Sequence, residues 1–205
     1  MPEAAPARVR VAPDGRLHAV AARGTLMGNR GCLHDAAGRV VRQATSYRGW
    51  VCCRLEFNGR RRRLRQPGRY TELFFLDEAT ALAAGHRPCG ECRHADHRGF
   101  RAALGGMPLR ELDARLHAER RPPGPGRVLP RGRLGDLPDG TMVLAVATPW
   151  LLLQGRLHGW SHDGYGASSP AEAAREVALL TPPTMVAALR SGYRPALHPS
   201  IRASA

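Results

Sequence analysis

The sequence has no lysine, one isoleucine and no long apolar run. All 31 Lys+Arg residues are therefore arginines, against 17 acidic residues, and the formal net charge is +14 with histidine neutral. Arginine keeps its charge and presents a planar fork that suits phosphate, so this surplus favours a nucleic acid or another phosphate-bearing partner. The absence of lysine by itself carries little information, because abundant Ala, Gly, Pro and Arg are typical of codon bias.

Membrane-spanning and disulfide-rich classes are not expected. The longest apolar runs, residues 142–147 and 150–153, are far shorter than the ~20 residues of a membrane helix, and the opening MPEAAPARVR lacks the apolar core of a signal peptide. The five cysteines are odd in number and unevenly spaced, which fits a disulfide framework poorly. We therefore expect a cytoplasmic protein with no membrane partner, in which cysteine serves a metal, a reaction or the core.

The pattern of breaks predicts an α+β chain in two units. A Gly-Gly pair at 105–106 and the segment PPGPGR at 122–127 flank residues 109–121, whose leucines recur at helical spacing. Short strands are expected at DGTMVLAVAT, PWLLLQG, RLHGWS and EVALL, followed by a helix over residues 184–191. The predicted division is a zinc-binding unit with a basic hairpin over 1–105, a helical connector and Pro/Gly-rich linker over 106–140, and a small mainly-β unit with a C-terminal helix over 141–205.

A β-hairpin is predicted over residues 50–64. The strand WVCCRLEF is followed by Asn-Gly at 58–59, the dipeptide favoured in type I′ turns, and then by RRRRL. Alternation places Cys53 among the apolar residues of the first strand, on the face that should look inward, and Cys52 with Arg54 on the other face.

Arginines of this hairpin and its neighbours form the predicted nucleic-acid contact set. A charge run is often only a solvated face, but this one lies on a predicted strand beside a candidate metal site, so phosphate contact is expected. The predicted contact residues are Arg54, Arg60, Arg61, Arg62, Arg63, Arg65 and Arg87.

The segment FFLDEATALAAGHRPCGEC carries the clearest chemical motif. A strand over 70–76 should stop at Asp77, a good N-cap, and a short helix over 78–84 should close at Gly85. Cys89 and Cys92, with a glycine between them, form a knuckle whose sulfurs can converge on one metal ion. A helix over 93–104 follows, and the hairpin, knuckle and helix together resemble a treble-clef zinc unit.

Residues 74–92 also resemble the second half of the metal-binding domain of the Ada DNA-alkylation-repair proteins. In that domain a strand and an alanine-rich helix run into a G-F/Y-R-P-C-x-x-C ending. Four cysteines there hold a zinc ion, and one of them accepts a methyl group from DNA phosphotriesters. The resemblance implies that Cys89 and Cys92 are the second ligand pair. The family's first pair, a C-x-x-x-C before the strand, is absent from this chain, which carries Cys32, Cys52 and Cys53 there.

A four-coordinate zinc ion needs two further ligands. Cys53 is the predicted third ligand, because its strand should pair near the knuckle. His34, in the segment RGCLHD, is the predicted fourth, with Cys32 and His97 as alternatives. His94 and His97, beside the knuckle, are candidate catalytic groups.

The predicted function is a zinc-binding protein that binds nucleic acid, with DNA as the expected partner. Two alternatives stay open. One is a nucleic-acid-processing enzyme, either a metal-dependent nuclease using His94 and His97 or an Ada-like alkyl acceptor. The other is a protein in which the glycine-rich loop at 24–31 and the C-terminal β unit enclose a phosphorylated metabolite.

Overall fold

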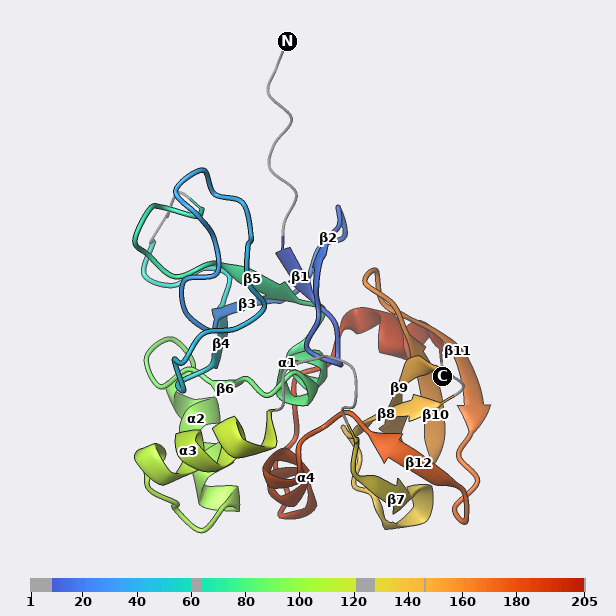
Figure 1. Ribbon diagram of the computed structural model, residues 1–205. Coiled ribbons are helices and arrows are strands. Elements are labelled where there is room, and N and C mark those ends of the chain that lie inside the picture. The colour runs from blue at the N-terminus through green and yellow to red at the C-terminus, as the bar shows by residue number, and fades with distance from the viewer. Residues whose placement is uncertain (1–8, 60–63, 121–127, 146, 205) are drawn as a thin grey trace.

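The computed structural model describes residues 9–59, 64–120, 128–145 and 147–204. Within these residues the chain forms two six-stranded sheets and four α-helices, so the α+β prediction is confirmed. Figure 1 shows the first sheet at the upper left, the second at the right and helix α1 between them. None of the described helices is long and apolar enough to cross a membrane.

The first sheet has the strand order β2-β1-β5-β3-β4-β6. Its strands are β1 (Val9–Val11), β2 (Leu17–Ala19), β3 (Leu26–Asn29), β4 (Val51–Arg54), β5 (Leu73–Phe75) and β6 (Arg87–Pro88). Strand β4 pairs antiparallel with β3 and parallel with β6. The sheet thereby brings the region around residue 53 next to the segment that follows residue 88.

The second sheet has the order β11-β10-β9-β8-β12-β7 and is antiparallel in all its described pairings. Its strands are β7 (Arg131–Arg133), β8 (Met142–Ala145), β9 (Thr148–Leu153), β10 (Arg156–Trp160), β11 (Tyr165–Pro170) and β12 (Glu176–Leu179). The sequence predicts β8, β9, β10 and β12 but not β7 or β11. Arg-Gly-Arg has no aromatic or β-branched residue, and Tyr-Gly-Ala-Ser-Ser-Pro has only the tyrosine among the residue types that favour strands.

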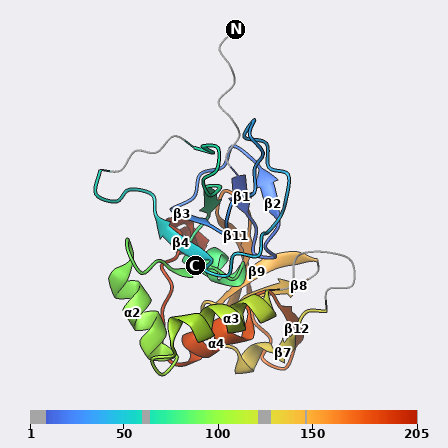
Figure 2. The same cartoon turned by 60° about the vertical axis from the view of Figure 1, so that its left-hand side comes forward.

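The helices are α1 (Glu78–Ala83), α2 (His94–Ala103), α3 (Leu109–Glu119) and α4 (Pro183–Arg190), and two short 3₁₀ turns are η1 (Leu134–Asp136) and η2 (Pro199–Ser204). Helix α1 begins where the sequence predicts, because the Asp77 carboxylate accepts a hydrogen bond from the Thr80 N–H at 2.9 Å. It is followed by Gly85, whose φ of +80° is in the left-handed region that glycine tolerates. Seen from the side in Figure 2, α2, α3 and α4 lie together below the first sheet.

Helix α1 is buried on all sides and belongs to three apolar clusters. Ala81 packs with the first sheet, Leu82 packs with α2, α3 and α4, and Ala79 packs with the second sheet. The alanine-rich sequence of α1 allows these neighbours to approach closely. The predicted N-terminal and C-terminal units thus share apolar clusters around α1, and the predicted boundaries between them stay a prediction.

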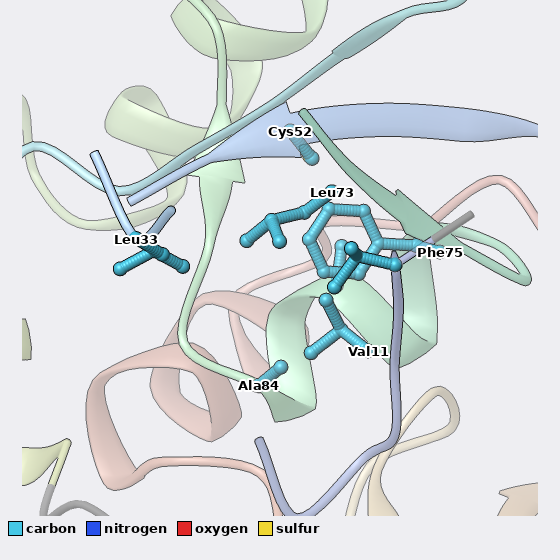
Figure 3. Close-up of a cluster of buried hydrophobic side chains, with 8 residues drawn as sticks. Val11, Leu33, Cys52, Leu73, Phe75 and Ala84 are labelled. Carbon is cyan, nitrogen blue, oxygen red and sulfur yellow. The ribbon is translucent and has the colours of Figure 1, made fainter. Parts of the chain in front are cut away.

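The predicted inward face of β4 is wrong. Cys52 is fully buried in the apolar cluster of the first sheet, next to Leu73 in Figure 3, whereas Cys53 is half-buried on the opposite face. Both faces of β4 are covered, one by α1 and the other by the knuckle, so an alternating pattern cannot identify the core side. The predicted hairpin pairing is also wrong, because β4 ends at Arg54 and pairs with β3 along one edge and with β6 along the other. Asn58 and Gly59 do have φ values of 52° and 64°, as a type I′ turn requires, and residues 60–63 lie outside the described residues.

Candidate metal centre

Three cysteines converge at the edge of the first sheet. The Sγ atoms of Cys53, Cys89 and Cys92 all lie within 4.8 Å of one another. Cys53 comes from β4, and the other two come from the turn between β6 and α2. The sequence predicts the same three residues as ligands of one ion.

Backbone pairing explains this convergence. In the parallel β4–β6 ladder, Cys52 is level with Pro88, and the N–H of Cys89 donates to the carbonyl of Cys52 at 2.9 Å. The next residue of each strand is a cysteine, so Cys53 and Cys89 meet at the end of the ladder. The C-x-x-C turn then returns Cys92 to the same place.

Hydrogen bonds to the knuckle hold its shape. The N–H of Arg93 donates to the carbonyl of Cys89 at 3.1 Å, and the N–H of Arg54 donates to the Cys92 sulfur at 3.4 Å. His97 uses Nδ1 for a hydrogen bond with the Pro88 carbonyl at 3.1 Å. Such outer contacts orient thiolates toward an ion and disperse their charge.

The three thiols differ in pKa. A hydrogen bond from Cys53, together with the backbone N–H groups of Cys92 and Glu91, lowers the pKa of Cys89 to about 5 despite partial burial. The same contact with Cys89, followed by burial, raises the pKa of Cys53, while burial is the main cause that raises the pKa of Cys92. A metal ion must displace the remaining protons, so binding should release them and weaken as the pH falls.

Cys52 is excluded from the group although it is adjacent to Cys53. Its sulfur lies on the other face of β4 and accepts a hydrogen bond from Nη1 of Arg93 at 3.1 Å. Burial is the main cause that raises the pKa of this thiol. It therefore behaves as a neutral core residue.

The cysteines line a pocket of about 360 Å³. In the register of the sheet, Phe74 on β5, Met27 on β3 and Cys53 on β4 are directly paired neighbours, so all three side chains project from one face. The remaining lining residues are Arg54, Leu55, Glu56, Phe57, Leu64, Tyr70, Glu72, Cys89, Glu91 and Cys92. Sequence reasoning misses this pocket, because its wall depends on the sheet order.

The predicted fourth ligand, His34, lies elsewhere. Its Nδ1 is 2.7 Å from the Thr71 hydroxyl and its Nε2 is 3.2 Å from the Gln66 carbonyl, so both ring nitrogens already have partners. Among the described residues, no His, Cys, Asp or Glu side chain joins the three cysteines at the same spacing, which leaves out Cys32 and His97 as well. His34 forms an isolated antiparallel bridge with Val40, and Cys32 lies two residues before it in the same segment.

The candidate catalytic histidines do not face one site together. His94 is exposed at the first residue of α2, whereas His97 is buried against the knuckle backbone. Burial is the main cause that lowers the pKa of His97. No interaction joins the two side chains in the described structure, and their catalytic role stays a prediction.

The predicted contact arginines differ in their surroundings. Arg54 is exposed beside the pocket, and residues 60–63 lie outside the described residues. Arg65 donates from Nη1 to the Gly38 carbonyl at 3.0 Å, and its N–H donates to Glu72 at 2.8 Å. Arg87 is buried and forms a two-pronged ion pair with Asp113 at 2.7 and 2.9 Å, so its guanidinium is not presented to a phosphate.

Comparison with family models, with curated proteins and with solved structures finds no match to this chain. The function is therefore argued from the chemistry of the site.

Proposed function

We propose that the protein binds zinc through Cys53, Cys89 and Cys92 and binds nucleic acid beside that zinc site. The observation that carries the proposal is the convergence of three sulfurs within 4.8 Å. Thiolates are soft ligands that favour zinc among the common divalent ions of cells, and a C-x-x-C turn is a recurrent zinc knuckle. The treble-clef unit that the sequence predicts, and the resemblance of residues 74–92 to Ada-type domains, would favour the same ion.

The fourth zinc position would face the pocket. Zinc is tetrahedral, and a site with three protein ligands keeps one position for water or for another molecule. Bound zinc would supply a Lewis acid and would keep all three sulfurs deprotonated. The chain's own contribution is to hold the sulfurs on a sheet edge and to exclude bulk water with the apolar wall of the pocket.

Charge supports nucleic acid as the partner. The chain has a net charge of +14, carried only by arginine. Arg54 lines the pocket, and Leu64 on the pocket wall directly follows the arginine run at 60–63. A phosphate held by Arg54 would lie near the zinc site, and such contacts release counterions from the nucleic acid.

A second candidate function is alkyl transfer, which the position of the three cysteines on the pocket wall favours, because it gives a ligand access to their sulfurs. A zinc-bound sulfur would attack the alkyl carbon of a DNA phosphotriester. The S–C bond would form, the C–O bond would break, and the phosphodiester would leave with the electron pair. Incubation with methyl phosphotriester DNA should then add about one methyl mass to one cysteine, and an unchanged protein mass would exclude this candidate.

The zinc proposal is tested by metal analysis of single variants. Wild-type protein purified without chelator should contain about one zinc per chain. Cys53→Ser and Cys89→Ser should lose it and should unfold more easily, because structural zinc contributes directly to folding. Cys32→Ser, at a half-buried cysteine outside the group, is the matched control. A zinc-free wild type, or equal loss in Cys32→Ser, would contradict the proposal.

Nucleic-acid binding is tested by its salt dependence. If about four phosphates are neutralised on duplex DNA, log affinity should fall against log salt with a slope of roughly −3.6. Joint replacement of Arg61 and Arg63 by alanine should flatten the slope by up to about two units. Joint replacement of Arg131 and Arg133 on β7 removes the same charge from exposed positions of the second sheet and should not. An equal salt slope in the two double variants would show that the phosphate contacts do not depend on Arg61 and Arg63.

A further inference from the structure

Two of the three clustered cysteines lie directly across a strand pair. In the parallel β4–β6 ladder, Cys52 is level with Pro88. The next level therefore holds Cys53 and Cys89. The N–H of Cys89 donates to the carbonyl of Cys52 at 2.9 Å, which fixes this register at the end of the ladder. Backbone pairing by itself thus keeps Cys53 and Cys89 side by side.

The spacing of this pair suits a disulfide. Neighbouring strands of a sheet lie about 4.8 Å apart, and a disulfide joins residues whose Cα atoms are about 4.4–6.8 Å apart. The Sγ atoms of Cys53 and Cys89 lie within 4.8 Å of each other, and the two side chains share a hydrogen bond. Rotation of the side chains can then bring the sulfurs to the disulfide bond length of about 2.05 Å without movement of the backbone.

The same two sulfurs are the ones that a small solute reaches. Cys53 and Cys89 are both half-buried on the pocket wall, whereas Cys92 is buried. The Cys92 sulfur also accepts the N–H of Arg54 at 3.4 Å. Cys52 is fully buried, and its sulfur lies on the other face of β4. Burial therefore leaves Cys53 and Cys89 as the pair that is open to an oxidant.

We propose that Cys53 and Cys89 form a reversible oxidation site, at which a hydroperoxide converts the two thiols into a cross-strand disulfide. One sulfur attacks a peroxide oxygen, so an S–O bond forms and the O–O bond breaks. The leaving oxygen takes the electron pair and a proton, and becomes water or an alcohol. The other sulfur then attacks the first, the S–S bond forms, the S–O bond breaks, and the hydroxyl leaves as water with the second proton. Two electrons pass from the sulfurs to the peroxide.

The disulfide would remove two of the three proposed zinc ligands. The thiolate is the form of cysteine that binds a metal, and a disulfide sulfur is not a thiolate. Of the three sulfurs, only that of Cys92 would still be able to bind, so oxidation should release the ion. This consequence rests on the proposed zinc site, whereas the disulfide rests on the strand register and on the exposure of Cys53 and Cys89.

The test treats the purified full chain, of known zinc content, with hydrogen peroxide. Remaining thiols are then blocked with N-ethylmaleimide in denaturant, and the intact mass is measured without reductant. Three of the five cysteines should take the block, and the other two should account for a loss of about 2 Da, the mass of two hydrogens. A metal indicator should report release of about one zinc per chain over the same time course. Dithiothreitol and added zinc should restore the free thiols and the metal, because a disulfide is reversible whereas a sulfinic acid is not.

Peptide mapping of the oxidised wild type locates the bond. Trypsin, which does not cut before proline, releases residues 49–54 and 70–93 as separate peptides. The disulfide should join these two peptides, with the bond at Cys53 and Cys89 and the block on Cys52 and Cys92. A bond within 70–93, or one that uses Cys52, would overturn the inference.

Variants give a second measurement. Cys32→Ser, at a half-buried cysteine outside the group, should form the same joined peptides as the wild type. Cys53→Ser should form none. Because Cys53→Ser is also expected to lose stability, the wild-type peptide map decides the outcome.

The two proposals fail differently. If the wild type holds zinc and peroxide yields no joined peptides, the oxidation site is wrong and the zinc site stands. If the wild type lacks zinc and still forms the bond between Cys53 and Cys89, the zinc site fails and the oxidation site stands.

Discussion

Nη2 of Arg93 donates a hydrogen bond at 2.8 Å to Oε2 of Glu78, and both side chains are buried. The same carboxylate accepts the Tyr193 hydroxyl at 2.6 Å and the Ala196 N–H at 2.9 Å. Arg93 directly follows Cys92 and also holds the Cys52 sulfur. The first residue of α1 therefore connects the cysteine knuckle to the C-terminal segment of the chain.

Loss of the Glu78 charge should destabilise the fold strongly. Glu78→Gln leaves the buried Arg93 guanidinium without its full counter-charge, which typically costs about 3–5 kcal/mol of unfolding free energy. Denaturant unfolding measures this difference. Glu111→Gln is the control, because its ion pair with Arg115 is exposed and should contribute less than about 1 kcal/mol. If Glu78→Gln lowers the unfolding free energy no more than Glu111→Gln does, the stabilising role of the Glu78–Arg93 ion pair is contradicted.

Features with a local cause could be predicted from the sequence. The Asp77 cap, the glycine after α1 and the C-x-x-C knuckle each depend on residues within one turn, and the structure has all three. The proximity of Cys53 to the knuckle is also confirmed. Its predicted face is not, because burial on both sides of β4 removes the difference between inward and outward positions.

Features that depend on distant pairing could not be predicted. His34 is not in the cysteine group, and its Nδ1 is 2.7 Å from the hydroxyl of Thr71, a partner that is distant in sequence. Arg87 is assigned to the surface by its charge, but Asp113 on α3 neutralises it in the interior. The pocket wall exists because β3 inserts between β5 and β4, an order that no local pattern indicates.

Arg87 should be a stability residue with no role in phosphate contact. Arg87→Gln leaves Asp113 partly buried without its partner, and we expect a loss of about 3 kcal/mol in unfolding free energy. The salt slope of DNA binding should equal that of the wild type. A slope flattened by about one unit would show that Arg87 does contact a phosphate.

The hydrogen bond of Tyr165 should stabilise the packing of the second sheet against the start of α1. Its hydroxyl donates to Oδ2 of the buried Asp77 at 2.8 Å, and burial raises the pKa of both groups. Tyr165→Phe removes a donor to a buried carboxyl group, so unfolding free energy should fall by about 1–3 kcal/mol. Tyr47→Phe, at a half-exposed tyrosine, is the matched control. Equal thermal stability of the two variants would contradict this role.

His86 should make the fold sensitive to acid. The ring is fully buried between Trp50 and Phe75, with centroid distances of 5.0 and 4.7 Å, and neither ring nitrogen has a hydrogen-bond partner in the described structure. Burial first, and then the charges of Arg30 and Arg120, lower its pKa well below the usual value. The folded protein therefore keeps this imidazole neutral.

In the unfolded chain the same imidazole titrates near its ordinary pKa of about 6.5. Below that pH the unfolded state binds a proton that the folded state does not, so unfolding free energy should fall as the pH drops from about 7 to about 5, with a limiting slope near 1.4 kcal/mol per pH unit from this residue. His86→Phe keeps an aromatic ring in the site and should remove that part of the slope. His97, His158 and His162 also have lowered pKa values and contribute to the wild-type curve, so the difference between wild type and variant isolates His86. Parallel curves for wild type and His86→Phe, measured by urea unfolding between pH 5 and 8, would show that His86 takes up its proton in the folded state as readily as in the unfolded one.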